Sequence, residues 1–275
     1  MEWGMKEQEK AGVTFLTFPL LEREGMVTHA FSTRKGGVSK GMFATMNFAG
    51  NRGDDPEHVR ENYRRMGTAL GVPPEQMVLS QQTHTTNLRI VTREDAGKGV
   101  VRERDYTDVD GLLTDEPGLM LVTSYADCVP LFFLDPVKRV IALSHSGWRG
   151  TVGRMGAVTV ERMQEVFGCE PGQILACIGP SICQSCYEVS EDVAEEFRLV
   201  FPETDWPEIL EEKPEKKYQL DLWNANRKIL LSAGIREDHL ASSGICTCCH
   251  SDLLFSHRAT QGKRGNLGAF LMLNS

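Results

Sequence analysis

Short apolar runs separated by turn residues recur along the whole chain. Between Asp108 and Gly150, three such runs cover residues 119–125, 129–134 and 139–143, each bounded by Gly, Pro or Asp. Runs this short between turn formers are typical of buried strands rather than helices. We therefore expect three consecutive strands at the centre of the chain.

The same pattern predicts the remaining elements on both sides of this segment. We expect further strands at 13–18, 26–32, 77–82, 87–92, 174–178, 241–246, 253–257 and 269–273, and helices at 57–70, 151–167, 191–200 and 222–233. Residues 201–217, with three prolines and many charges, are expected to form a surface excursion or mobile loop. Without repeats or a low-complexity linker, residues 1–275 are expected to form one α+β or α/β domain.

Composition narrows the class of protein. Hydrophobic content of 41% and charged content of 25% are ordinary for a globular protein, and a net charge of −8 argues against a general nucleic-acid binder. No apolar run approaches transmembrane length, and residues 1–10 lack the apolar core of a signal peptide. We therefore expect a cytoplasmic protein without membrane or nucleic-acid partners, whose eight cysteines are free thiols or metal ligands.

Three residues near predicted strand ends could share one site. Cys128 lies at the junction of the first two central runs, His145 lies at the end of the third, and His84 follows the strand expected at 77–82. Two imidazoles and a thiolate with a fourth position open are the ligands of a catalytic zinc. Cys128 and His145 could instead be a nucleophile and its base. A buried inert thiol and two hydrogen-bonded histidines are the third interpretation.

A second group of cysteines offers another metal site. Cys183 and Cys186 form one C-x-x-C pair, and Cys246 and Cys249 form another. Two such pairs can close a four-thiolate zinc site, but these lie much farther apart than the roughly 15–20 residues common in zinc ribbons. From this spacing we expect the four cysteines to bind no metal, although some of them could be neighbours.

Several motifs, in order, carry a resemblance to a known family. They are FSTRKGGVS, QQTHT, ADCVPLFFLDP, HSGWRG, IGPSICQSCYEV, LDLWNANRKILLSAGI and CTCCHSDLLFSHR. Together they resemble the multicopper polyphenol oxidases, or laccase-domain proteins, over nearly the whole chain. The resemblance implies a layered α/β/β/α sandwich with mixed sheets. It also implies a purine nucleoside phosphorylase acting on adenosine, inosine and methylthioadenosine, with adenosine deaminase activity.

The resemblance also implies site residues. The family's metal ligands fall on His84, Cys128 and His145, which would hold zinc, with copper possible. Two positions depart from the family pattern: Thr85 stands where a glycine is usual after the histidine, and Tyr125 stands where threonine is usual before Ala-Asp-Cys. A glycine would allow close approach or a positive φ, so the local loop is expected to differ.

The implied chemistry assigns further roles. In deamination a metal-activated water attacks C6 of adenine, and Asp127 would either move the proton or orient His84 or His145. In phosphorolysis, phosphate needs cationic or N–H donors, for which the candidates are Arg34, Lys35 and Arg149. Residues 33–39 could alternatively form a solvated β-turn, and Arg149 could stack on Trp148. Glu188 and Arg258 would line the substrate pocket or hold it together.

Alternative functions remain open at this point. A copper-dependent polyphenol oxidase needs an additional copper cluster, and seven histidines, two of them in the site above, are few for that purpose. A metal-free hydrolase would use Cys128 as nucleophile and His145 as base. A non-enzymatic structural role would show no turnover. Metal analysis separates zinc, copper and metal-free hypotheses, and no feature of the sequence indicates the oligomeric state.

Overall fold

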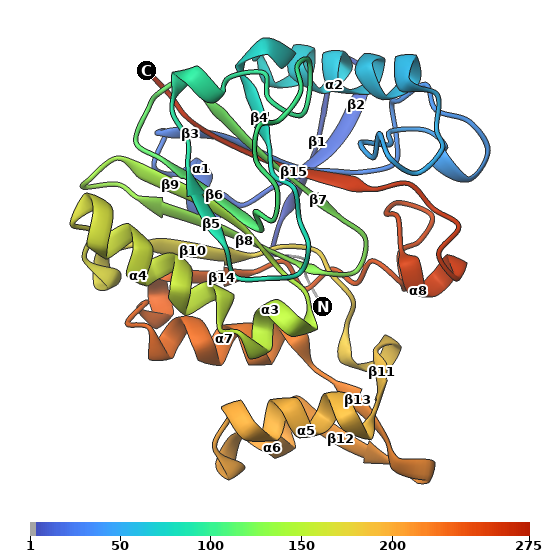
Figure 1. The fold of residues 1–275 in the computed structure, drawn as a ribbon, viewed down its shortest axis with the longest axis vertical. Helices are drawn as coiled ribbons and strands as arrows, with labels where there is room; N and C mark the ends of the chain where they lie inside the picture. Colours follow the sequence, from blue (N-terminus) through green and yellow to red (C-terminus); the bar gives the residue numbers. More distant parts are fainter. Residues whose placement is uncertain (1–3) are drawn as a thin grey trace.

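The computed structural model describes residues 4–275, which form two stacked six-stranded sheets and a smaller three-stranded sheet. In Figure 1, helix α2 (Pro56–Leu70) covers the outer face of one large sheet, and α3 (Trp148–Val152), α4 (Met155–Phe167) and α7 (Leu222–Ser232) cover the other. The order of layers is therefore helix, sheet, sheet, helix. The layered α/β/β/α sandwich expected from the family resemblance is confirmed.

Both large sheets are mixed. The first has the order β1 (Lys6–Lys10), β2 (Val13–Thr17), β3 (Val27–Ser32), β15 (Leu267–Leu273), β7 (Met120–Tyr125) and β4 (Met77–Leu79), in which only the β4–β7 pair is parallel. The second has the order β14 (Leu240–Ser242), β10 (Leu175–Ile178), β8 (Val129–Asp135), β9 (Val140–Ser146), β6 (Gly111–Thr114) and β5 (Leu88–Ile90). The three central apolar runs thus form β7, β8 and β9, as predicted.

Strand β8 shows how the layers are held together. Its alternate residues Leu131 and Phe133 pack with α4 and α7, whereas Phe132 and Leu134 enter the core between the two sheets. Strand β7 divides its side chains in the same way between the inter-sheet core and the core under α2. Because both faces of these strands are covered, their sequences are continuous apolar runs instead of alternating ones.

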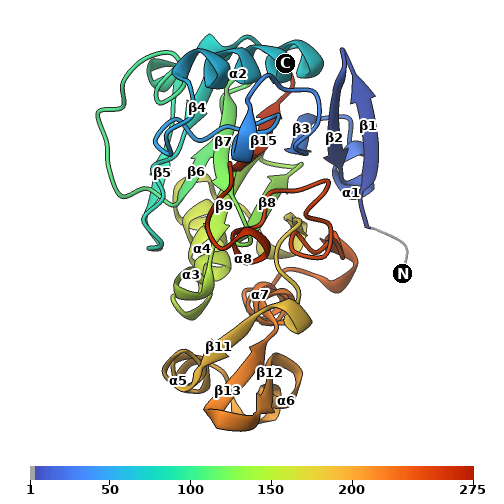
Figure 2. The ribbon, with the colours of Figure 1, turned by 90° about the vertical axis from the view of Figure 1, so that its right-hand side faces the viewer.

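A small subdomain extends from one end of the sandwich (Figures 1 and 2). It contains β11 (Glu188–Ser190), α5 (Glu191–Val200), α6 (Trp206–Ile209), β12 (Leu210–Lys213) and β13 (Lys217–Leu220), with β13 between the other two strands. Its prolines and charges predicted a surface excursion or mobile loop at 201–217. This segment instead forms α6, β12 and the start of β13. Its apolar residues Phe201, Ile209 and Leu210 are buried, which the prolines obscured in the sequence.

Two other local predictions were wrong. The helix expected at 151–167 is two helices, because Arg154 adopts a left-handed conformation (φ 58°) between α3 and α4. The strand expected at 253–257 is a turn, in which the Leu253 and Leu254 N–H groups donate to the His250 carbonyl, and it leads into α8 (His257–Thr260). The first helix of the chain, α1 (Pro19–Glu22), follows β2. Within residues 4–275, no helix is both long and apolar enough to cross a bilayer.

His29 on β3 predicts a pH dependence of stability. Its Nε2 accepts the Phe18 N–H at 2.8 Å, and burial lowers the pKa of His29 to about 4. The folded state therefore favours neutral His29. The stability that it contributes is complete above about pH 6.5 and is lost as the pH falls towards 4, by roughly 3 kcal/mol in total. Urea unfolding at pH 7.5 and 5.0 should show this loss in the wild type.

The His29→Gln variant keeps an acceptor for Phe18 but cannot titrate. Its free energy of unfolding should change less between these two pH values than that of the wild type, even if the variant is less stable at both. An equal slope in both proteins would contradict the assignment.

Candidate active site

The strands β7, β8 and β9 position two of the three expected metal ligands. Cys128 occupies the tight connection between β7 and β8, and His145 lies opposite Pro130 in the β8–β9 ladder. His84 follows β4 in a loop at the same end of the sheets, where its φ of 68° is left-handed. Residues that are far apart in sequence therefore meet where these strands end.

The three side chains converge as predicted. The Cys128 Sγ lies 4.0 Å from the His84 Nε2, and one ligand atom from each of His84, Cys128 and His145 lies within 4.8 Å of the others. The two imidazole rings are 5.0 Å apart and nearly perpendicular. These separations suit ligation of one ion at zinc bond lengths of about 2.0–2.3 Å.

Asp110, which was not among the candidates from the sequence, organises this site. Its fully buried carboxylate accepts hydrogen bonds from the backbone N–H groups of Thr83, His84 and Thr85 at 2.9–3.0 Å. The same carboxylate lies 2.8 Å from the His145 Nδ1. That contact leaves the His145 Nε2 for a ligand. Asp110 therefore orients His145 and shapes the His84 loop, a role that the sequence analysis considered for Asp127. The signal was available in Asp108-Val109-Asp110-Gly111, just before β6.

The charges of these groups depend on one another. Burial alone would raise the pKa of Cys128, but the charge of His145 and hydrogen bonds to both histidines lower it to about 6. Burial would lower the pKa of His145, but the charge of Cys128 and the hydrogen bond to Asp110 raise it to about 9. Burial opposes ionisation of Asp110 as well, but its bond to His145 and the N–H donors lower that pKa to about 2. The site thus favours the thiolate that a metal ligand or a nucleophile requires.

The structure explains why Gly147 occurs in the HSGWRG motif and how Thr85 is accommodated in the QQTHT motif. A Cβ on Gly147 would lie 3.0 Å from the Cys128 Sγ and 3.2 Å from the His84 ring, so a larger residue would crowd both side chains. The positive φ in the QQTHT loop falls on His84 itself, and Thr85 instead donates its hydroxyl to Asp110 at 3.1 Å. Thr85 therefore replaces the usual glycine without a backbone penalty.

Asp127 does not contact either histidine in the way that was expected. Its two carboxylate oxygens accept hydrogen bonds from the Thr247 hydroxyl and the Arg258 N–H, both at 2.7 Å. Its backbone carbonyl accepts the Ile182 N–H at 3.0 Å. Asp127 therefore ties the peptide before Cys128 to two later loops.

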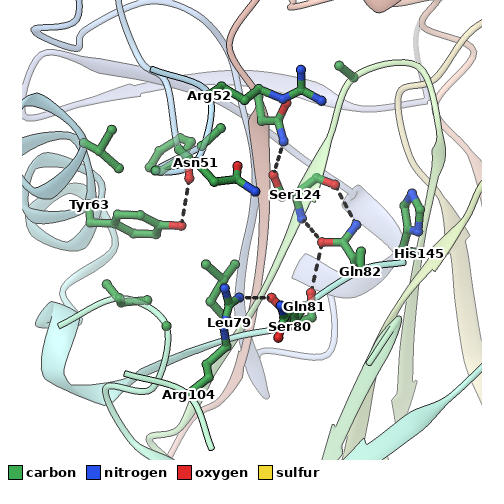
Figure 3. A pocket seen from close by; sticks show the side chains of 18 of the residues that line it. Asn51, Arg52, Tyr63, Leu79, Ser80, Gln81, Gln82, Arg104, Ser124 and His145 are labelled. Atoms are coloured by element: carbon green, nitrogen blue, oxygen red, sulfur yellow. Dashed lines mark hydrogen bonds between the residues drawn. The ribbon is translucent and has the colours of Figure 1, made fainter. Parts of the chain in front are cut away.

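A cavity of about 610 Å³ adjoins the three candidate ligands, all of which line it. Figure 3 shows its polar wall, which includes Gln81, Arg52 and Arg104. The same cavity is lined by Arg264, which is buried and whose Nε has no hydrogen-bond partner within the described chain. Burial, followed by the charge of Arg52, lowers the pKa of Arg264 to about 10. Two neighbouring cations in one cavity provide a site for an anion.

The cations expected to bind phosphate lie elsewhere. Arg34 donates to the carbonyls of Ala44 and Ser251 at 3.0 and 2.7 Å and stacks on Phe255, so its guanidinium holds loops together. Neither Arg34 nor the exposed Lys35 lines the cavity. Sequence reasoning missed Arg52 and Arg264 because they lie in segments without a recognised motif.

Three further candidates form a separate group. Arg149 is exposed and stacks on Trp148 at 4.2 Å. Arg258 stacks on Tyr187 at 5.2 Å and donates to the backbone carbonyl of Glu188 at 3.0 Å, while the Glu188 side chain is exposed. None of the three lines the cavity beside His84 and Cys128. Arg258 and Glu188 instead join α8 to the base of the small subdomain.

Comparisons with known proteins identify the family of this chain. Residues 28–274 match the family model described as multi-copper polyphenol oxidoreductase laccase. The chain is 38% identical over 244 residues to the purine nucleoside phosphorylase YlmD of Geobacillus stearothermophilus, covering 87% of this chain and 88% of that protein. It is 33% identical over 232 residues to the adenosine deaminase RL5 of an unknown prokaryotic organism, covering 83% and 87% of the two proteins.

The fold agrees as well. The crystal structure of YlmD from Geobacillus stearothermophilus superposes with a TM-score of 0.90 at 35% identity and covers 100% of both chains. The match of motifs, the full-length similarity and the shared fold lead to one conclusion: this chain belongs to the multi-copper polyphenol oxidoreductase laccase family.

Proposed function

We propose that this protein is a zinc-dependent purine nucleoside phosphorylase that acts on adenosine, inosine and methylthioadenosine and also deaminates adenosine. The observation that carries the proposal is the convergence of His84, Cys128 and His145 beside a cavity that Arg52 and Arg264 also line. The names of the relatives YlmD and RL5 support the two activities. A cavity of about 610 Å³ lies within the roughly 300–1,000 Å³ typical of small-molecule sites.

The donor set fits zinc. Two imidazole nitrogens and one thiolate leave one coordination position open, as in catalytic zinc sites. Zinc bound there would polarise a substrate oxygen or lower the pKa of a water molecule. Asp110 supports this by fixing the His145 ring through Nδ1 and by holding the peptide of His84. The residues of the chain thus fit a metal in that position.

The phosphate is proposed to bind to Arg264 and Arg52. The guanidinium of Arg264 contacts Asn266 and the Gly265 carbonyl but no carboxylate, and its Nε remains without a partner in the described residues. A buried cation in that state favours a bound anion, because an anion offsets the free energy lost on desolvation. Arg264 is also close enough to Cys128 for the two charges to interact. A phosphate on Arg264 would therefore lie near the metal ligands.

Side-chain amides are proposed to read the nucleoside. Gln82 is already engaged, because it donates to the Ser124 carbonyl and accepts from the Ser80 hydroxyl and the Ser124 N–H. Across the described chain, the side chains of Gln81 and Asn51 form no such bonds, and both line the cavity (Figure 3). An amide can both donate and accept, as the edge of a purine requires. Asp127, whose oxygens are occupied, is proposed to position Cys128.

A metal-free Cys–His hydrolase is the second candidate. It is favoured by the lowered pKa of Cys128 and by the contact of His145 with a buried carboxylate, which together resemble an activated nucleophile with an oriented base. A copper oxidase is less well supported. Across residues 4–275, the groups with metal-ligand geometry contain only two histidines, fewer than an additional copper cluster needs.

The Cys128→Ala variant tests the metal mechanism. Loss of the only thiolate in the set should remove most of the metal affinity, because three-ligand sites have little redundancy. Release of adenine and hypoxanthine from adenosine and inosine, with and without phosphate, and formation of inosine from adenosine should fall to background. Cys169→Ala, at a buried cysteine outside the site, is the control and should keep metal and activity.

The wild-type result separates the hypotheses. Zinc-loaded protein that forms neither free base nor inosine would refute the purine assignment. Full activity in Cys128→Ala would refute the metal mechanism while leaving the substrate open. Activity in metal-free wild type that is lost in Cys128→Ala would support the hydrolase.

The arginines give a second prediction. Arg52→Gln and Arg264→Gln should each lower kcat/KM for phosphorolysis by up to about 10²–10³, the usual cost of losing one donor to a developing anion, while the metal content stays unchanged. Arg149→Ala and Arg34→Ala each remove one cation outside the cavity and serve as the matched controls. If only the Arg149 variant loses phosphate use, the phosphate lies on the Trp148 side and the proposed location is refuted.

Asp110 gives a third prediction. Asp110→Asn keeps the size of the side chain but removes its charge and replaces one acceptor oxygen by a donor, which faces N–H groups or the His145 ring. Zinc affinity should fall by about 10–100-fold, as for other residues that orient a metal-binding histidine. Competition with a chromophoric chelator measures this directly. Asp115→Asn, at an exposed carboxylate just after β6, is the control and should bind zinc as the wild type does.

A further inference from the structure

Four cysteines outside the active site form a second cluster. All four sulfurs lie within 4.8 Å of one another, those of Cys183, Cys186, Cys246 and Cys249. The Cys186 and Cys249 sulfurs are 3.5 Å apart, and those of Cys183 and Cys249 are 4.0 Å apart. All four are free thiols. The large sequence separation that argued against a metal is therefore irrelevant in the folded chain.

The spacing of the sulfurs matches a tetrahedral site. Four thiolates at zinc–sulfur bonds of about 2.3 Å are separated from one another by roughly 3.8 Å. The Cys186–Cys249 and Cys183–Cys249 sulfur separations, 3.5 and 4.0 Å, lie on either side of this value. A disulfide would require one pair of sulfurs at about 2.0 Å and would leave the other two thiols without a function in the cluster. The arrangement suits one ion bound by all four sulfurs.

The backbone around the cluster is arranged for thiolates. The Cys246 Sγ accepts the backbone N–H groups of Cys183 at 3.3 Å and of Cys249 at 3.4 Å. Hydrogen bonds from N–H groups stabilise an anionic sulfur. The two loops are also paired directly, because Ser181 and Cys246 form a parallel β-bridge. Each C-x-x-C turn is thus held in a fixed register against the other.

We propose that Cys183, Cys186, Cys246 and Cys249 bind one structural zinc ion, separate from the metal held by His84, Cys128 and His145. Four thiolates fill a tetrahedral zinc completely and leave no position for a substrate, which is the property of structural sites. A zinc at that place fastens the chain entering the small subdomain, just before β11, to the loop after β14. Its role is therefore to hold two segments of the fold together.

The position of the cluster links it to the active site. Thr247, between two of the cysteines, donates its hydroxyl to Asp127 at 2.7 Å, and the Ile182 N–H, just before Cys183, donates to the Asp127 carbonyl at 3.0 Å. Arg258 donates to the Cys186 carbonyl at 3.3 Å and, through its backbone N–H, to Asp127. Asp127 immediately precedes the metal ligand Cys128. The zinc would thus stabilise the two loops that hold this peptide.

Metal content of protein purified under reducing conditions tests the proposal. Wild-type protein should contain two zinc ions per chain, measured by elemental mass spectrometry against a quantitative amino-acid analysis. Cys249→Ser should contain one and should keep the site at Cys128. Cys128→Ala should also contain one. Cys248→Ser changes the neighbouring cysteine, which is not a member of the cluster, and should retain both ions.

Cobalt substitution identifies the ligands of each ion. Cobalt bound by four thiolates gives intense sulfur-to-metal charge-transfer bands, whereas cobalt bound by one thiolate and two imidazoles gives weaker ones. The intense bands should survive in Cys128→Ala and disappear in Cys249→Ser. This readout depends on neither turnover nor the identity of the substrate, so failure of the proposed enzymatic function would not affect it.

Three results would contradict the proposal. The first is a wild-type protein with one zinc per chain that is lost completely in Cys128→Ala. The second is a disulfide between any two of the four cysteines, found by mass spectrometry of alkylated, unreduced protein that was purified with reductant. Retention of two zinc ions in Cys249→Ser would likewise exclude this cysteine as a ligand.

Discussion

Coverage of both large sheets on both faces is the constraint from which the rest of the structure follows. Helix α2 buries one outer face, α4 and α7 bury the other, and the inner faces bury each other. Strands in such an environment can carry few polar side chains along their length, because a buried polar group without a partner costs free energy. Reactive groups therefore gather where strands end. Cys128, between β7 and β8, is the clearest example.

Two buried aspartates at these ends each have several partners. Asp110 serves the His84 loop and His145 at once, and Asp127 serves the loops of Thr247 and Arg258. Asp110 thus holds the two histidines in place, and Asp127 holds the peptide before Cys128. The proposed catalytic metal and the proposed four-thiolate zinc would be connected through Asp127 and the short peptide that it begins.

The sequence predicted the elements whose pattern is local. The runs that became β7, β8 and β9, and the helix α2 introduced by Asp55 and Pro56, needed only apolar spacing and turn residues. It predicted the convergence of His84, Cys128 and His145 with help from the family resemblance. Asp110, Arg264 and the four-cysteine cluster escaped because they depend on which strands pair and which loops cross, and neither follows from spacing along the chain. The subdomain strands β12 and β13 escaped because their charges and prolines hid a few buried apolar positions.

The position of β15 in the sheet determines when the first sheet can form during synthesis of the chain. This strand, at residues 267–273, lies in the middle of the first sheet, between β3 and β7, and pairs with both. A growing chain on the ribosome would hold β3 and β7 for a long time with a gap between them. The sheet can close only after residue 273 has emerged, and contacts so distant in sequence form slowly. Strand β7 leads directly to Cys128, so the loop that carries Cys128 follows a strand whose pairing within the sheet is completed only by β15.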